Sequence, residues 1–188
     1  MRAKEQRLPA EVARQLLSYD PATGLLTWLP REGSPAFNTK YAGQPAGNVR
    51  KNGKVYAGVT IDGQTRLYAN HRLAWLLYHG EWPAKDIDHI NRNPTDNRIA
   101  NLRLATHAQN LANQSMRRDN TSGCRGVFWI ERSKRWVALI SQYNGGNQRN
   151  IYLGSFTDKA EAIRVRQEAA RRLFGEFANE TPVDLSAA

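Results

Sequence analysis

The sequence predicts an α+β protein in which short helices and pairs of strands alternate along 188 residues. Three observations support this class: apolar residues at helical spacing near the N-terminus, a hairpin signal at Asp62-Gly63, and three strand-like stretches before a C-terminal helix. Hydrophobic residues make up 40% of the chain and charged residues 23%, so the chain has enough apolar side chains to build a core. We expect a small N-terminal helix and β-hairpin, a central strand-loop-strand-helix segment, and a C-terminal three-stranded antiparallel sheet packed on one helix.

The N-terminal part is expected to hold one helix, a basic arm and a hairpin. Apolar residues recur at helical spacing in the first segment, at Leu8, Val12, Leu16 and Leu17. Residues 20–24 (DPATG) are a turn signal that ends this helix. Residues 31–52 are rich in Gly, Pro, Asn and basic residues, which predicts a long loop or a loosely ordered arm. Residues 55–68 predict two strands joined at Asp62-Gly63.

The central part is expected to contain a helix and then a strand, a loop, a second strand and another helix. Residues 70–80 show apolar residues at helical spacing. A short strand is predicted near Ile87, and a loop with Asn-Pro and Asp-Asn turn signals follows it. A second strand is predicted near Leu102, and a polar helix begins near Thr106.

A change of composition at residues 118–121 predicts a domain boundary. After a turn cluster, residues 126–141 alternate aromatic and aliphatic side chains, and a third strand at 150–156 precedes a helix at 158–174. We therefore divide the chain into three parts. They are an N-terminal helix and basic arm (1–54), a central domain (55–118) and a C-terminal domain (119–188).

The charge of the chain favours a polyanionic partner. It has 27 Lys and Arg residues against 17 Asp and Glu residues, a net charge of +10. Residues 31–56 and residues 117–135 each carry a net +4 and mix this charge with Gly, Asn and aromatic residues, as a surface that follows a nucleic-acid backbone does. The aromatic signature of the common RNA-binding modules is not visible, which favours DNA.

Cysteine usage and hydropathy exclude several classes. Cys124 is the one cysteine, which excludes an internal disulfide and every zinc site that needs two or more thiolates. We expect a reducing, cytoplasmic setting. No apolar stretch approaches the roughly 20 residues that cross a bilayer, and the charged N-terminus is unlike a signal peptide. A membrane or secretory role is therefore not expected.

Four polar residues in the central part could form a phosphodiesterase site. Asp88 and His89 are adjacent, Asn101 follows 12 residues after His89, and Asn110 follows 9 residues after Asn101. Carboxylate and amide oxygens are hard ligands suited to Mg²⁺ or Mn²⁺. A histidine, with an unperturbed pKa of about 6.5, can take the proton from an attacking water. The alternative is that Asp88 and His89 form an ordinary hydrogen-bonding pair and the asparagines are turn residues. Spacing alone leaves both interpretations open.

The run DHINRNPTDNRIANLRLATHAQNLAN (88–113) resembles the HNH endonuclease motif, in the branch of phage and intron homing endonucleases whose third position is Asn. The flanking segments HRLAWLLYHGEWP and SYDPATGLLTW resemble the same proteins. The resemblance implies a ββα-metal fold in which His89 is the general base and Asn101 is the structural middle residue of the catalytic motif. It also implies that Asp88 and Asn110 bind one divalent ion, Mg²⁺ or Mn²⁺. His107 lies on the same helical face and is an alternative to Asn110.

The C-terminal segments TSGCRGVFWIERSKRWVALI, IYLGSF and AEAIRVRQEAARRLFGEFA resemble the Apetala-type (ethylene-response-factor type) DNA-binding domain. That family lays a three-stranded sheet in the major groove. The resemblance implies DNA contacts by four side chains: Arg125, Arg135, Trp136 and Arg149. For Trp136 a place in the core of the sheet is the open alternative. Phe128 and Asn150 depart from the arginines of the plant pattern, so the target preference of the plant domain is not implied.

These observations together predict a site-specific, metal-dependent DNA endonuclease of the homing type. It would hydrolyse one phosphodiester bond per bound monomer, which is nicking, and leave a 5′-phosphate and a 3′-hydroxyl. Its partner would be double-stranded DNA, and its place would be the cytoplasm of a bacterial or phage-infected cell. The alternative from another class is a DNA-binding regulator with a vestigial nuclease fold.

Overall fold

The computed structural model describes residues 8–116, 119–144 and 147–179. The chain divides into two compact units, the first ending at Ala105 and the second beginning at Thr106. The sequence-based division at residues 54 and 118 stays a prediction. The mixed helix and sheet content confirms the predicted α+β class.

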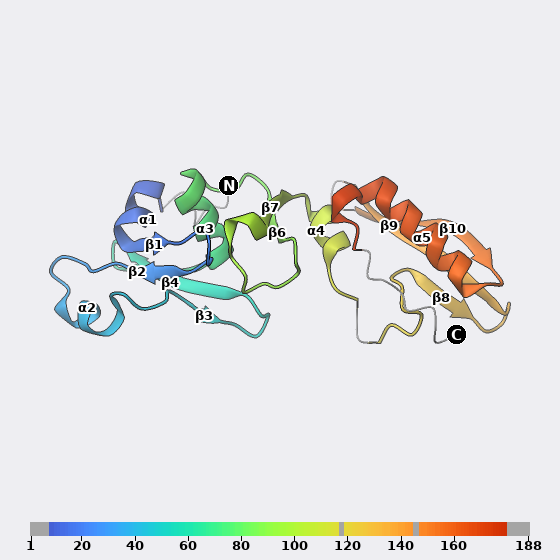
Figure 1. Cartoon of the computed structure of the whole chain (residues 1–188), viewed down its shortest axis with the longest axis horizontal. Coiled ribbons are helices and arrows are strands. Elements are labelled where there is room, and N and C mark those ends of the chain that lie inside the picture. Colours follow the sequence, from blue (N-terminus) through green and yellow to red (C-terminus); the bar gives the residue numbers. More distant parts are fainter. Residues whose placement is uncertain (1–7, 117–118, 145–146, 180–188) are drawn as a thin grey trace. The chain divides into compact units, whose positions relative to one another are not determined.

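The first unit consists of short helices around three small antiparallel sheets (Figure 1). The sheets pair β1 with β2, β4 with β3 and β5, and β6 with β7. Its elements are α1 (Ala10–Leu16), β1 (Leu17–Tyr19), β2 (Leu26–Trp28), α2 (Pro35–Tyr41), β3 (Asn48–Val49), β4 (Val55–Ile61), β5 (Gln64–Ala69), α3 (Asn70–His79), β6 (Asp86–His89), the 3₁₀ helix η2 (Ile99–Asn101) and β7 (Leu102–Ala105).

The core of the first unit forms around α3, whose Leu73 and Leu76 are buried among side chains of α1, β1, β4 and β5. Trp82 closes this core, because its ring stacks on Tyr68 with 5.7 Å between centroids. Its Nε1 donates to the carbonyl of Leu8 at 3.0 Å. The indole thus buries a large apolar area while its one polar atom keeps a hydrogen bond.

Two parts of this unit differ from the sequence prediction. The predicted arm at residues 31–52 contains the seven-residue helix α2 and the two-residue strand β3, so the prediction of one long loop was wrong there. Pro35 occupies the first turn of α2, where its missing N–H costs nothing, and Phe37 packs edge-on against Trp28 with 5.9 Å between centroids. The turn at residues 20–24 joins two strands, β1 and β2, that the sequence analysis did not predict.

The second unit is a three-stranded antiparallel sheet with a helix along it, as predicted (Figure 1). Its elements are α4 (His107–Asn113), β8 (Val127–Ile130), β9 (Arg135–Asn144), β10 (Asn147–Phe156), α5 (Lys159–Phe174) and the 3₁₀ helix η3 (Gly175–Phe177). Asp158 caps α5, because its carboxylate accepts from the backbone N–H groups of Ala160 and Glu161 at 3.1 Å each. The core of the unit joins β8, β9 and α5 through Val127, Ala138 and Ile163.

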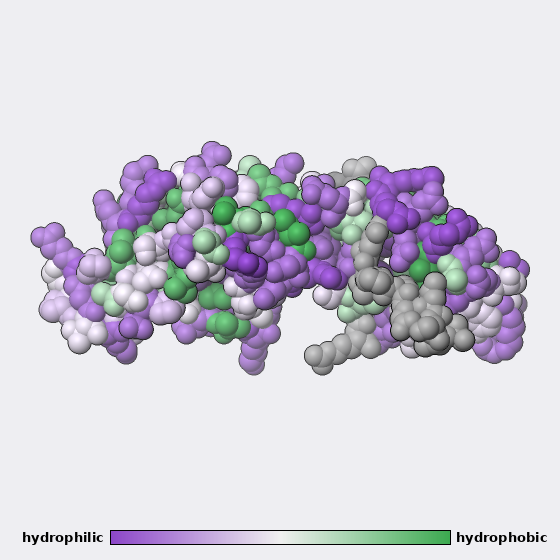
Figure 2. Space-filling view, viewed as in Figure 1, coloured by the Kyte–Doolittle hydropathy of each residue, from purple (hydrophilic) through white to green (hydrophobic). Residues whose placement is uncertain are grey.

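Hydrophilic residues dominate the face of the molecule drawn in Figure 2, with small apolar patches between them. Over the described ranges, the structure has no helix long and apolar enough to cross a membrane.

Candidate active site

Strands β6 and β7 hold the first two predicted site residues. Their antiparallel register sets Asp88 opposite Arg103 and His89 opposite Leu102. Both site residues are buried, with Asp88 4% and His89 7% exposed. They stand where β6 ends and the loop toward η2 begins, so a β-strand fixes their backbone while the loop determines what surrounds them.

Asp88 forms an ion pair with its cross-strand neighbour. The Nε of Arg103 donates to Oδ2 of Asp88 at 2.9 Å, and both side chains lie mostly out of water. A buried carboxylate without a partner would cost several kcal/mol, on the order of 3–5 when one partner of a buried pair is removed. Arg103 therefore supplies the charged partner that a buried carboxylate needs. No pattern in the sequence pointed to this contact, which depends on the register of β6 and β7.

His89 is held by an amide that the sequence analysis had assigned only to the loop. Its Nε2 lies 3.1 Å from Oδ1 of Asn97, which is itself buried. An amide oxygen only accepts, so Nε2 carries the hydrogen and Nδ1 is the unprotonated nitrogen of the neutral ring. The ring of His71 packs edge-on against His89, with 5.2 Å between centroids.

The surroundings of His89 favour the neutral ring. Burial lowers the pKa of His89, and the positive charge of Lys54 lowers it further. The hydrogen bond that His89 donates to Asn97 and the charge of Asp88 act in the opposite direction and do not outweigh burial. A neutral imidazole at neutral pH is the form that a general base needs.

The N-terminal hairpin holds Asn97 in place. Tyr19 on β1 donates its hydroxyl hydrogen to the carbonyl of Asn97 at 2.8 Å. The turn after β1 packs directly on the backbone of Asn97 and Arg98, because a Cβ at Gly24 would lie 2.4 Å from the nitrogen of Arg98. The N–H of Ile99 donates to the carbonyl of Pro21 at 3.2 Å. The segment SYDPATG, interpreted from the sequence as a turn signal and as part of the family resemblance, was the signal for this support.

Asn101 organises the same loop. Its Nδ2 donates to Oδ1 of Asn91 at 3.0 Å and to the carbonyl of Asp96 at 2.8 Å. Its Oδ1 accepts from the backbone N–H of Asn91 at 2.9 Å. These three hydrogen bonds join the two ends of the loop, which is the geometry that the predicted structural role requires. The role itself stays a prediction.

Asn110 and His107 lie on α4 in the second unit. A capping box starts this helix, because the Thr106 hydroxyl accepts from the N–H of Gln109 and the Gln109 side chain accepts from the N–H of Thr106. His107 is exposed, and its ring meets that of Tyr143 edge-on with 5.9 Å between centroids. The metal-binding roles predicted for Asn110, and for His107 as its alternative, stay predictions.

The donor types of the predicted metal site suit a hard divalent ion. Asp88 offers a carboxylate and Asn110 an amide oxygen, the ligand types that Mg²⁺ and Mn²⁺ prefer. The described part of the chain has no group of three or more His, Cys, Asp or Glu side chains that could hold a metal.

The four predicted DNA-contacting residues have different surroundings in the second unit. Arg125 donates to the carbonyls of Leu111, Gln114 and Ser115 at the end of α4. Arg135 is exposed and donates to the hydroxyl and the carbonyl of Ser155 at 2.9 and 3.0 Å. Trp136 is half-buried against the core, and Arg149 is exposed. Trp136 therefore has the core placement that the sequence left open, and the DNA contacts stay predictions.

Comparison with known proteins gives this site a class. Residues 68–112 match the HNH endonuclease family, and this stretch contains Asp88, His89, Asn101 and Asn110. The chain is thus a nuclease with an HNH domain.

Two viral proteins are similar to the chain. Protein 3.8 of Escherichia phage T7 is 31% identical over 109 residues, which cover 57% of this chain and 86% of the T7 protein. An uncharacterized HNH endonuclease of Acanthamoeba polyphaga mimivirus, L560, is 30% identical over 116 residues, which cover 61% of this chain and 57% of the mimivirus protein. With the match above, the coverage of the T7 protein shows that the chain belongs to the HNH endonuclease family.

A solved structure concerned with DNA binding and cleavage by the HNH homing endonuclease I-HmuI is weakly similar. It has a TM-score of 0.41 and 19% identity, and the match covers 72% of this chain and 71% of that chain. The C-terminal resemblance to the Apetala-type domain lies beyond the family match, which ends at residue 112, and stays a prediction.

Proposed function

We propose that the protein is a site-specific DNA endonuclease of the homing type that hydrolyses a phosphodiester bond with His89 as its general base. The observation that carries this proposal is the buried hydrogen bond from His89 Nε2 to Asn97 Oδ1 beside Asp88. A histidine fixed in one tautomer and kept neutral by burial is prepared to accept a proton. A DNA-binding regulator would have no use for such an arrangement.

In this mechanism Nδ1 of His89 takes a proton from the water that attacks the phosphorus. The imidazolium that forms keeps its Nε2–H bond to the amide of Asn97, and the nearby carboxylate of Asp88 stabilises its charge. When bound by Asp88 and Asn110, a single Mg²⁺ or Mn²⁺ ion would neutralise charge on the phosphate and on the leaving 3′ oxygen. Asn101 acts indirectly, by holding the loop that positions His89.

The substrate is double-stranded DNA, and the product is a nick with a 5′-phosphate and a 3′-hydroxyl. The net charge of +10 supports a polyanionic substrate. One HNH stretch per chain supports one cut per bound monomer. The T7 and mimivirus relatives support action inside an infected cell.

The proposal is tested by incubating the full chain with supercoiled plasmid and with a phage genome, in the presence of Mg²⁺ or Mn²⁺. We expect discrete nicks that DNA ligase reseals, because ligase requires a 5′-phosphate beside a 3′-hydroxyl. His89→Ala should reduce cleavage by about 10²–10⁴-fold with DNA binding retained. His79→Ala, which removes an exposed histidine at the end of α3, serves as the control and should cut normally. Binding without cleavage by the unaltered protein would favour the regulator.

A further inference from the structure

A buried arginine in the second unit lacks an acceptor for its charge. Arg166, in the middle of α5, is 9% exposed, and its Nε makes no hydrogen bond. No carboxylate among the described residues forms an ion pair with it. Because a buried ionised group without a partner is costly, natural proteins almost always pair such a group with an anion or a set of hydrogen-bond acceptors. The structure thus contains a buried cation that no carboxylate of the described residues pairs with.

A second guanidinium lies beside the first. Arg125 donates only to neutral carbonyls at the end of α4, so no carboxylate neutralises its charge there. Burial lowers the pKa of Arg166, and the positive charge of Arg125 lowers it further. Two like charges held in partly desolvated positions repel each other, and an anion between them would relieve both the repulsion and the desolvation.

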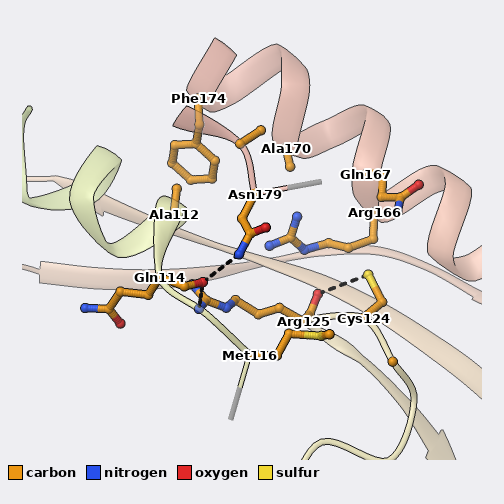
Figure 3. A pocket seen from close by; sticks show the side chains of 12 residues that line it. Ala112, Gln114, Met116, Cys124, Arg125, Arg166, Gln167, Ala170, Phe174 and Asn179 are labelled. Atoms are coloured by element: carbon orange, nitrogen blue, oxygen red, sulfur yellow. Dashed lines mark hydrogen bonds between the residues drawn. The ribbon is translucent and has the colours of Figure 1, made fainter. Parts of the chain in front are cut away.

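Both arginines border a cavity (Figure 3). The guanidinium of Arg166 extends from α5 into this space, which Arg125, Gln114 and Asn179 also line. The cavity has a volume of about 40 Å³. A larger groove of about 350 Å³ shares Arg125, Arg166 and Gln114 with it and continues over the sheet.

The side chains that line the cavity and the groove favour a negatively charged ligand. Among the described residues that line them there is no aspartate or glutamate, and the charged side chains are those of the two arginines. The groove is also lined by the polar side chains of Ser141, Tyr143, Gln148 and Asn150, which hydrogen-bond to one another. Guanidinium groups are the usual means of binding a phosphate through two parallel hydrogen bonds.

We infer that the cavity between α4 and α5, together with the adjoining groove over β9, binds a phosphate group through Arg166 and Arg125. The phosphate belongs either to the DNA backbone or to free inorganic phosphate, because the two offer the same oxygens to a guanidinium. The DNA source rests on the proposed function, whereas binding of inorganic phosphate does not. Neither source requires that the protein cut DNA.

The first experiment measures thermal unfolding of the full chain in phosphate and in chloride at equal ionic strength. We expect phosphate to raise the melting temperature of the unaltered protein above its value in chloride. Arg166→Met should lose this phosphate effect. In chloride it should melt at or above the unaltered protein, because it removes an unpaired buried charge. Arg164→Gln, which removes an exposed positive charge from the same helix, should keep the full phosphate effect. Arg166→Lys keeps the positive charge at this position. It is the second variant to measure if Arg166→Met does not fold.

The second experiment separates the two sources. Binding of a fluorescent 30-base-pair duplex is measured between about 50 and 200 mM salt for the unaltered protein, Arg166→Met and Arg164→Gln. Loss of one backbone contact should lower the slope of log K against log salt by about 0.9 in Arg166→Met only. An unchanged slope together with the phosphate effect assigns the site to free phosphate. Equal melting behaviour in phosphate and chloride, or a marked destabilisation of Arg166→Met in chloride, would overturn the inference.

Discussion

At the scale of single residues, the side chain of His89 depends on a partner eight positions away along the chain. Asn97 determines which ring nitrogen of His89 carries the hydrogen, and Tyr19 holds the backbone of Asn97 from a separate hairpin. In this chain of contacts, His89 is the group that would react, and the other two act by positioning it. Removing either partner should therefore impair catalysis more than DNA binding.

Replacing Asn97 tests this directly. Asn97→Ala leaves Nε2 of His89 without its acceptor, so the ring can adopt the other tautomer or rotate. We expect cleavage to fall by about 10–100-fold, the usual effect of losing a group that orients a reacting side chain. Asn93→Ala, which removes an exposed amide from the same loop, is the control and should cut normally. Nitrogen NMR should show a single Nε2–H tautomer of His89 in the unaltered protein. Normal cleavage by Asn97→Ala would show that the hydrogen bond is incidental.

The hydrogen bond from Tyr19 to Asn97 depends on pH, because Tyr19 can donate it only while its hydroxyl is protonated. Burial raises the pKa of Tyr19 to about 12, and the negative charges of Asp20 and Asp96 raise it further. The neutral phenol is the form that donates to the Asn97 carbonyl. The unfolded chain would titrate near its ordinary value of about 10, so the stabilisation by Tyr19 is complete below that pH and is lost as pH rises toward 12. Tyr19→Phe should cost about 0.5–1.5 kcal/mol of unfolding free energy at pH 8. In urea unfolding, this difference should shrink as pH rises above about 10. A constant difference up to pH 11.5 would contradict the assignment.

At the scale of elements, the turn between β1 and β2 is the part of the fold that most directly supports the site. Gly24 has φ +77 and approaches the backbone of Asn97 and Arg98, so that a Cβ there would lie 2.6 and 2.4 Å from their atoms. A larger residue must push the turn away from the loop that carries Asn97. A displacement of this turn would therefore move the backbone of Asn97 and, through it, the side chain of His89.

Gly24→Ala and Gly43→Ala form a matched pair. Gly43 has φ +76, almost the same conformation, but no atom lies within 4 Å of where its Cβ would be. Both variants incur the cost of a left-handed alanine, about 1 kcal/mol, and only Gly24→Ala adds the clash. We expect Gly24→Ala to lose more stability than Gly43→Ala in urea and to lose most of its cleavage activity. Equal effects on stability and cleavage in the two variants would show that the turn does not support the site.

The elements differ in how far the sequence predicts them. The β4–β5 hairpin carries its own turn signal at Asp62-Gly63, and α3 has ten residues over which helical spacing can show. Helix α2 has seven residues and strands β1 and β2 have three each, too few for a periodic pattern. Asp88, His89 and Asn101 could be singled out because they lie in one short run that resembles the HNH motif, and their roles stay predictions. The support from Tyr19 was missed because it joins residues 78 positions apart.

At the scale of the whole molecule, the composition predicts a polyanionic partner but not which surfaces meet it. The sequence places a boundary at residues 118–121, whereas the compact second unit begins at Thr106 and includes α4. Two contacts that help join α4 to the rest of the second unit are the donation from Arg125 to Leu111 and the packing of His107 on Tyr143, and no change of composition marks them. The helix carrying Asn110 thus belongs to the same unit as the predicted DNA-reading sheet. The salt dependence of binding can therefore be assigned to each unit separately.

Two double variants measure the part that each unit plays in DNA binding. Arg50→Gln with Lys51→Gln removes two exposed charges from the first unit, and Arg135→Gln with Arg149→Gln removes two from the second. If each side chain neutralises one phosphate, either double variant should lower the slope of log K against log salt by about 1.8. The combination of both should lower it by about 3.6, because charges on separate units act independently. The measurement uses one cleaved duplex between about 50 and 200 mM salt. A slope unchanged by Arg135→Gln with Arg149→Gln would show that these two arginines do not contact DNA, and that binding rests on other surfaces.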